Sequence, residues 1–119
     1  MQKWLAAQAA GALAISAWVA TEFSAALSIK LRTGDINATH RANALAAFAT
    51  LCDESFTLLE VTARNFRAAA LFADQAPLGL RAGDALHLAI CAEHGAQLCT
   101  LDRNLSAAGS PLGVRTVLL

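Results

Sequence analysis

Short apolar runs alternate with longer helix-forming segments along the whole chain, and this alternation limits the possible folds most strongly. Four runs have the length and apolarity of buried strands, at residues 13–16, 56–61, 97–101 and 114–118. The segments between them carry helical patterns, and several end at glycine. Strands that alternate with helices in this way form a parallel sheet covered by helices on both faces. We therefore expect one α/β domain spanning residues 1–119.

The helical segments are bounded by recognisable caps and stops. Asp35 or Asn37 can cap a helix that runs to about residue 52, and Thr62 can cap the next one. Glycines at positions 34 and 95 can end two further helices. These signals predict six helices, at residues 3–9, at 17–32, from the cap at 35 or 37 to about 52, at 63–74, at 81–94 and at 103–108.

Composition excludes several classes of protein. Hydrophobic residues make up 56% of the 119 residues and charged residues 15%, which excludes a disordered tail. Nine basic and nine acidic residues cancel, so no global positive field favours nucleic acid. Cys52, Cys91 and Cys99 form no CxxC pair, which indicates buried thiols in a reducing compartment. No uninterrupted apolar run approaches the roughly 18 to 20 residues that span a bilayer. We expect a cytoplasmic protein.

Glu22 lies among apolar residues at helical spacing. The neighbours that would share its helix face are Trp18, Val19, Phe23 and Ala26. A carboxylate on such a face must be paired, protonated or bound to a cation. The sequence leaves two interpretations open, a salt bridge with Lys30 or an arginine, and a functional site.

Asp84 and Asp102 also lie at positions where a carboxylate has two explanations. Asp84 is in the first turn of its expected helix, where it complements the helix dipole, but it shares a face with His87, Leu88 and Cys91. Asp102 directly follows the strand at 97–101, where an aspartate is a natural N-cap. The carboxyl ends of parallel strands are also where α/β proteins bind ligands. Thr100 would point to the same side as Asp102.

Considered together, the three acids favour a metal site. Glu22, Asp84 and Asp102 would meet at one end of the sheet, where their charges repel each other unless a divalent cation neutralises them. Oxygen ligands alone favour Mg²⁺ or Mn²⁺ over zinc. We therefore expect these three carboxylates to converge within a few ångströms.

Three segments of the chain resemble the PIN domain of VapC-type toxins from toxin–antitoxin pairs. They are residues 14–34 with the TEF motif, residues 79–105 with the GDALHLA and TLDRNL motifs, and the closing GVRTVLL. The resemblance implies a PIN-like three-layer sandwich, with a parallel sheet flanked by helices. It also implies a metal-dependent endoribonuclease in which Glu22, Asp84 and Asp102 hold one or two Mg²⁺ (or Mn²⁺) ions and Thr100 supports the last acid. Water would then attack an RNA phosphodiester in line. The implied partners are RNA, a cognate VapB-like antitoxin and a second copy of the chain.

The chain departs from the family pattern at its beginning. The family opens with a central strand that ends in an aspartate, of the form L-D-T-S, and nothing similar precedes Lys3. We therefore expect the strands at 13–16 and 97–101 to pair directly or to accept a strand from another copy. With three acids we expect weak Mg²⁺ affinity and little or no nuclease activity. The alternative function is a non-catalytic PIN-like module for binding or dimerisation.

Basic residues offer no equally specific signal. Four arginines could contact RNA phosphates, because a guanidinium suits that geometry, or could be solvated surface charges. They are Arg64, Arg67, Arg81 and Arg103.

Overall fold

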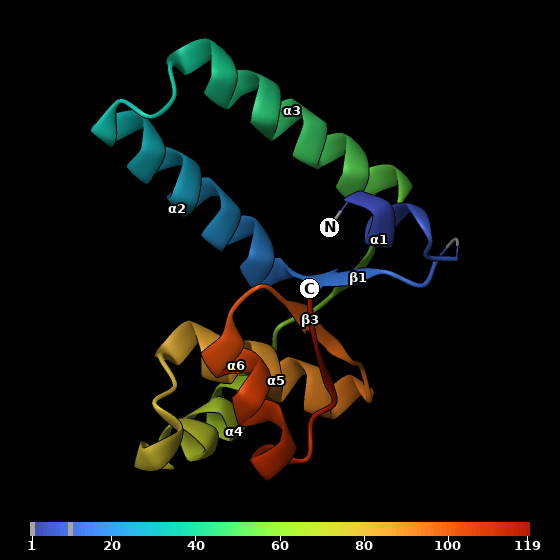
Figure 1. Cartoon of the computed structure of the whole chain (residues 1–119), viewed down its shortest axis with the longest axis vertical. Helices are drawn as coiled ribbons and strands as arrows, with labels where there is room; N and C mark the ends of the chain where they lie inside the picture. The colour runs from blue at the N-terminus through green and yellow to red at the C-terminus, as the bar shows by residue number, and fades with distance from the viewer. Residues whose placement is uncertain (1, 10) are drawn as a thin grey trace. The chain divides into compact units, whose positions relative to one another are not determined.

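The computed structural model describes residues 2–9 and 11–119, which divide into an N-terminal unit (residues 1–60) and a C-terminal unit (residues 61–119). The N-terminal unit contains α1 (Gln2–Ala6), β1 (Ala14–Ser16), α2 (Ala17–Thr33), α3 (Ala38–Glu54) and β2 (Thr57–Leu59) (Figure 1). The C-terminal unit contains α4 (Ala63–Ala73), η1 (Ala76–Leu78), α5 (Ala82–His94), β3 (Leu98–Thr100), α6 (Arg103–Gly109), η2 (Ser110–Leu112) and β4 (Thr116–Leu118). No helix in the described residues is long and apolar enough to cross a membrane.

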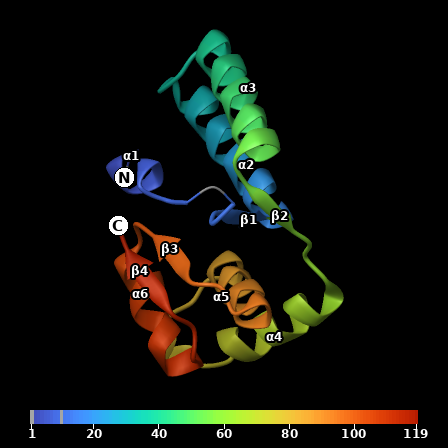
Figure 2. The same cartoon turned by 90° about the vertical axis from the view of Figure 1, so that its right-hand side faces the viewer.

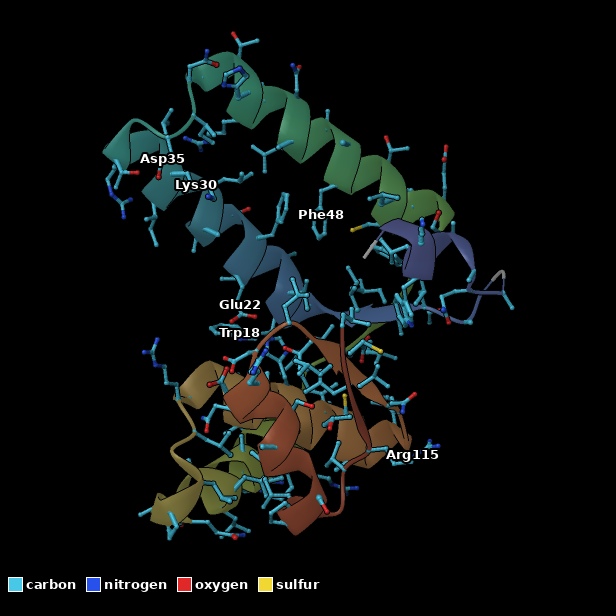
Figure 3. All side chains as sticks on the ribbon, viewed as in Figure 1. Trp18, Glu22, Lys30, Asp35, Phe48 and Arg115 are labelled. Atoms are coloured by element: carbon cyan, nitrogen blue, oxygen red, sulfur yellow. The ribbon has the colours of Figure 1, made fainter. Side chains whose placement is uncertain are left out.

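Helices α2 and α3 form a hairpin in the N-terminal unit. Gly34 ends α2 in the left-handed conformation, with φ of 81°, and its N–H donates to the Leu31 carbonyl at 3.2 Å. Asn37 caps α3 by accepting a 2.8 Å hydrogen bond from the His40 N–H, which decides between the two expected caps. The two helices lie side by side (Figures 1 and 2). Phe48 points from α3 toward α2 and stacks on Phe23, with ring centroids 4.2 Å apart (Figure 3).

The C-terminal unit has a core built from α5, α6 and the segment before β4. Its buried members are Leu88, Leu105, Ala108 and Val114. Partly buried side chains pack around them, and these are Phe72, Leu78, Leu80, Cys91, Leu98 and Leu112. Leu88 is fully buried, with 0% exposure. Thr62 caps α4 and Gly95 follows α5, both as predicted from the sequence.

All four strands pair in parallel. Residues 14–16 of β1 align with 57–59 of β2, and residues 98–100 of β3 align with 116–118 of β4. The prediction of an α/β chain with parallel strands is confirmed, and helices connect the two members of each pair.

The strands are shorter than expected and are paired two by two rather than in one sheet. Each has three residues, and the two sheets have the orders β1–β2 and β3–β4. The run at 56–61 is cut to Thr57–Leu59 because its last residue, Val61, leads directly into the Thr62 cap. β1 pairs with β2 and β3 pairs with β4, the next strand along the chain in each case. Bringing these strands together closes a shorter length of chain than pairing with a more distant strand, and so costs less chain entropy. Direct pairing of β1 with β3, or a strand from another copy placed between them, stays a prediction.

Candidate functional site

Asp102 is the N-cap of α6 and directly follows β3. Its Oδ1 accepts hydrogen bonds from the N–H groups of Asn104 at 2.9 Å and Leu105 at 3.2 Å. Its own N–H donates to Thr100 Oγ1 at 3.0 Å. The threonine hydroxyl therefore fixes the turn that carries the aspartate. Because the cap uses Oδ1, the second oxygen, Oδ2, lies outside it, so capping and ligand binding are compatible in one side chain.

Asp84 lies in the first turn of α5 and is half-buried. Its Oδ2 accepts a 3.4 Å hydrogen bond from the Arg81 N–H at the start of the helix. That donor is otherwise without an intrahelical partner, so the carboxylate compensates for the helix end. As in Asp102, one oxygen is held by backbone and Oδ1 is left outside that bond.

The two aspartates lie at the same end of the C-terminal unit. The side chain of Asn104, two residues after Asp102, donates from Nδ2 to the carbonyl of Gly79 at 3.4 Å. Gly79 begins the short turn that leads to Arg81 and α5. This contact joins the start of α6 to the start of α5. The carboxyl end of β3, Asp84 and Asp102 thus form one acidic end, which we call the acid end (residues 79–84 and 100–104).

Glu22 belongs to the N-terminal unit and differs from its expected environment. It is the sixth residue of α2, so it lies about two turns from the carboxyl end of β1. Its side chain is exposed, whereas Trp18, Val19 and Phe23 are half-buried. The expectation that Glu22 lies on a buried apolar face is therefore wrong. The half-buried stripe continues to Leu27, and Glu22 and Ala26 lie beside it on the exposed surface. Burial therefore does not force a cation on Glu22.

Comparison with known families bears on these acids. The PIN domain family matches residues 1–110, which include all of the N-terminal unit and most of the C-terminal unit. The chain belongs to the PIN domain family. No curated protein matches the chain. PIN domains are generally nucleases that use divalent metal ions and bind RNA.

The donor set of this PIN domain fits a hard divalent cation. Asp84 and Asp102 offer carboxylate oxygens, the ligands that Mg²⁺ and Mn²⁺ prefer. Backbone donors orient one oxygen of each, so the other is held in a restricted position. Within the described residues of either unit, no three His, Cys, Asp or Glu side chains are close enough to hold a metal. The convergence of Glu22 with the two aspartates remains a prediction.

The cysteines of the PIN domain are poor candidates for this chemistry. Cys52, Cys91 and Cys99 are free thiols and half-buried. Burial raises the pKa of the Cys91 thiol, and the neighbouring Cys99 raises it further. Burial also raises the pKa of Cys99. Raised values keep both thiols protonated, and the thiolate is the form that attacks substrates and binds metals.

A shallow pocket of the C-terminal unit lies away from the two aspartates. It is lined by Gln97, Ser110 and residues 113–116, at the amino ends of β3 and β4. Arg115, on this side of the unit, donates to the Gly95 carbonyl at 3.3 Å (Figure 3). Ligands of parallel α/β sheets bind at the opposite, carboxyl ends of the strands. The residues that line this pocket do not include any of the acid end.

Sequence reasoning missed Asn104 and Ser16. Asn104 occupies the TLDRNL motif, but its contact with Gly79 joins positions 25 residues apart, which no local pattern reveals. Ser16 is the N-cap of α2 at the end of β1, and its buried hydroxyl has no hydrogen-bond partner among the described residues. A serine between a strand and an alanine-rich helix was the available signal for that cap.

Proposed function

We propose that this PIN-domain protein is a metal-dependent endoribonuclease of the VapC toxin type. The observation that supports this most directly is the pair Asp84 and Asp102 at the carboxyl end of β3, each with one oxygen held by backbone N–H groups. The Thr100 hydroxyl accepts a hydrogen bond from the Asp102 N–H, which supports the role that the resemblance implies for it. Glu22, near the carboxyl end of β1, is the proposed third ligand.

The proposed mechanism divides the work between the metal and the side chains. A bound Mg²⁺ or Mn²⁺ ion supplies activation of water and stabilisation of the leaving oxygen. Asp84, Asp102 and Glu22 supply the negative charge that holds the ion. The cap of α6 and the Thr100 contact keep Asp102 from turning away, which holds its free oxygen in position before substrate arrives.

The proposal includes the partners that the resemblance implies. A VapB-like antitoxin would restrain the enzyme by placing an arginine of its C-terminal segment beside the carboxylates. Failure of the product of a neighbouring reading frame to co-purify after co-expression would count against this partner. A homodimer is also proposed, and a monomer by light scattering at micromolar concentration would count against it. We further propose that residues 1–119 act as one cytoplasmic domain, which requires a single cooperative unfolding transition.

Metal binding and RNA cleavage together test the proposed function. The purified chain is freed of metal with a chelator, and its melting temperature and RNA cleavage are then measured as Mg²⁺ or Mn²⁺ is added. An ion that binds only the folded protein stabilises it by about 2.7 kcal/mol at 100 times its dissociation constant. We expect the melting temperature to rise at high metal concentration, and we expect the RNA cleavage of this chain to be weak and to depend on the metal. Asp84→Asn should lose most of both effects.

Asp74→Asn is the matched control. It makes the same chemical change at an exposed position of the same unit, after α4, and should behave like the unmodified chain. RNA binding with no metal effect and no cleavage would indicate the non-catalytic module instead. If the chain bound neither RNA nor a metal ion, the proposed function would be refuted.

The same assay addresses the first strand of the family. We expect a version extended upstream by a strand carrying an aspartate to bind Mg²⁺ more tightly and to cleave RNA faster than the chain of 119 residues, because it has a fourth carboxylate. Equal activity in the two versions would show that this strand is not needed and that we have misread the site.

A further inference from the structure

The four arginines that the sequence left undecided lie at two different ends of the C-terminal unit. Arg64 and Arg67 are in the first half of α4. The side chain of Asn65, also near the start of α4, donates to Glu93 Oε2 near the end of α5. The first half of α4 therefore lies beside the last turn of α5. This places Arg64 and Arg67 away from Asp84, which is in the first turn of α5.

Arg81 and Arg103 lie at the acid end. Arg81 directly precedes α5, three residues before Asp84, and Arg103 directly follows Asp102. The hydrogen bond from Asn104 to Gly79 joins these two turns. One arginine thus accompanies each aspartate, although the two pairs are about 20 residues apart in the chain.

Both arginines of the acid end are exposed. Within residues 61–119, all of which are described, no Asp or Glu forms an ion pair with either guanidinium. Within the C-terminal unit, the two positive charges therefore lie on the surface without an acidic partner. An RNA backbone approaching Asp84 and Asp102 meets carboxylates that repel its phosphates, and the chain has no net positive charge to offset that repulsion. Besides the proposed metal ion, cationic side chains beside the acids are then the available source of attraction for the phosphates.

We infer that Arg81 and Arg103 bind the RNA phosphates on the two sides of the scissile one, whereas Arg64 and Arg67 do not contact the substrate. This inference rests on the proposed ribonuclease function and adds to it the residues that hold the substrate backbone. A guanidinium presents a planar fork of N–H donors that matches two phosphate oxygens. Contacts to phosphates position a nucleic acid without reading its sequence. The two arginines would thus set the position of the RNA backbone and would not select the base sequence at the cleavage site.

The test measures RNA binding rather than cleavage. Asp84→Asn serves as the background, because it removes a metal ligand and is expected to bind RNA without cutting it. Arg81→Gln and Arg103→Gln are added to it singly and together. Binding of a fluorescently labelled single-stranded RNA of mixed sequence is followed by anisotropy at several salt concentrations. Each substitution should weaken binding roughly three- to tenfold at low salt, and should reduce the slope of log affinity against log salt by about 0.7.

Arg64→Gln and Arg67→Gln are the matched controls, and should change neither affinity nor slope. Arg81→Lys and Arg103→Lys separate the effect of the positive charge from that of the guanidinium geometry, because lysine keeps the charge and lacks the planar fork of N–H donors. These lysine variants should have the same salt slope as the Asp84→Asn background, and an RNA affinity between that of the background and that of the glutamine variants. Equal effects of all four glutamine substitutions, or an unchanged slope in the Arg81→Gln/Arg103→Gln variant, would overturn the inference while leaving the ribonuclease proposal intact. Absence of RNA binding in the unmodified chain would refute both.

Discussion

In the version extended upstream by a strand carrying an aspartate, Asp102→Asn is expected to lower metal-dependent RNA cleavage by about 100-fold or more, since a lost ligand should cost at least as much as a lost partner of a ligand. The stability of the fold should not change. Asparagine keeps the Oδ1 atom that accepts from the N–H groups of Asn104 and Leu105, and it caps helices as well as aspartate does. Only the negative charge is lost. The substitution therefore distinguishes the two roles of this side chain, because it keeps the cap of α6 and removes the charge of the proposed metal ligand.

The measurement combines cleavage of a labelled RNA with thermal unfolding of the same preparations. Asp102→Ala removes both the cap and the charge, and should lose activity together with about 1 kcal/mol of stability. Asp74→Asn, exposed in the same unit, should change neither quantity. Full activity in Asp102→Asn would remove this residue from the metal site. If Asp102→Asn and Asp102→Ala destabilised the protein equally, the cap of α6 would require the negative charge of Asp102.

Asn65→Ala is expected to destabilise the protein by about 2 to 4 kcal/mol, because several hydrogen bonds of a buried side chain are lost together. Asn65 is 1% exposed. Its Oδ1 accepts from the N–H of Thr62 at 2.9 Å and from the Thr62 hydroxyl at 3.2 Å, and its Nδ2 donates to Glu93. The side chain thus completes the cap of α4 and joins α4 to α5. Its removal also leaves the Thr62 N–H without this partner.

Thermal or urea unfolding checks this prediction, and the melting temperature should fall by roughly 10 °C. Asn43→Ala is the matched control, since Asn43 is exposed on α3 and its replacement should change stability by less than about 0.5 kcal/mol. Glu93→Gln keeps an acceptor for Asn65 and should cost less than Glu93→Ala, which leaves the Asn65 amide without one. A stability of Asn65→Ala within error of the unmodified chain would show that water replaces these bonds.

The helices followed from the sequence because their limits depend on neighbours three or four residues away. Thr62 and Asn37 cap their helices through side-chain bonds to residues 65 and 40, and Gly34 and Gly95 provide the left-handed conformation after α2 and α5. Such interactions are complete within one turn of chain, so a local pattern contains them. The strands were predicted as parallel members of an α/β chain, but their length was overestimated. An apolar run shows that a segment can be buried, not how many of its residues find a partner.

The positions of the three acids in their helices and turns were predictable from the sequence, whereas their environment was predictable only in part. Asp102 caps α6 and keeps one oxygen outside the cap, so the cap is confirmed and its role as a metal ligand stays a prediction. Asp84 is half-buried at the start of α5, as the shared face with Leu88 indicated. Glu22 is exposed, although helical spacing placed it among apolar residues. Periodicity gives the side of a helix on which a residue lies, whereas neighbouring elements decide how much of that side is covered.

The sequence by itself determined the alternation of strands and helices, the caps, and the positions of Asp84 and Asp102 at the starts of α5 and α6. Only the tertiary structure decided which strands pair and which residues meet across long stretches of chain. Asn65 reaches Glu93 over 28 positions, and Asn104 reaches Gly79 over 25. These two contacts separate the four arginines into opposite ends of the C-terminal unit, although all four look alike in the sequence. The physical reason is that a cap is satisfied by its own turn of backbone, while a partner far along the chain is chosen by how whole helices pack.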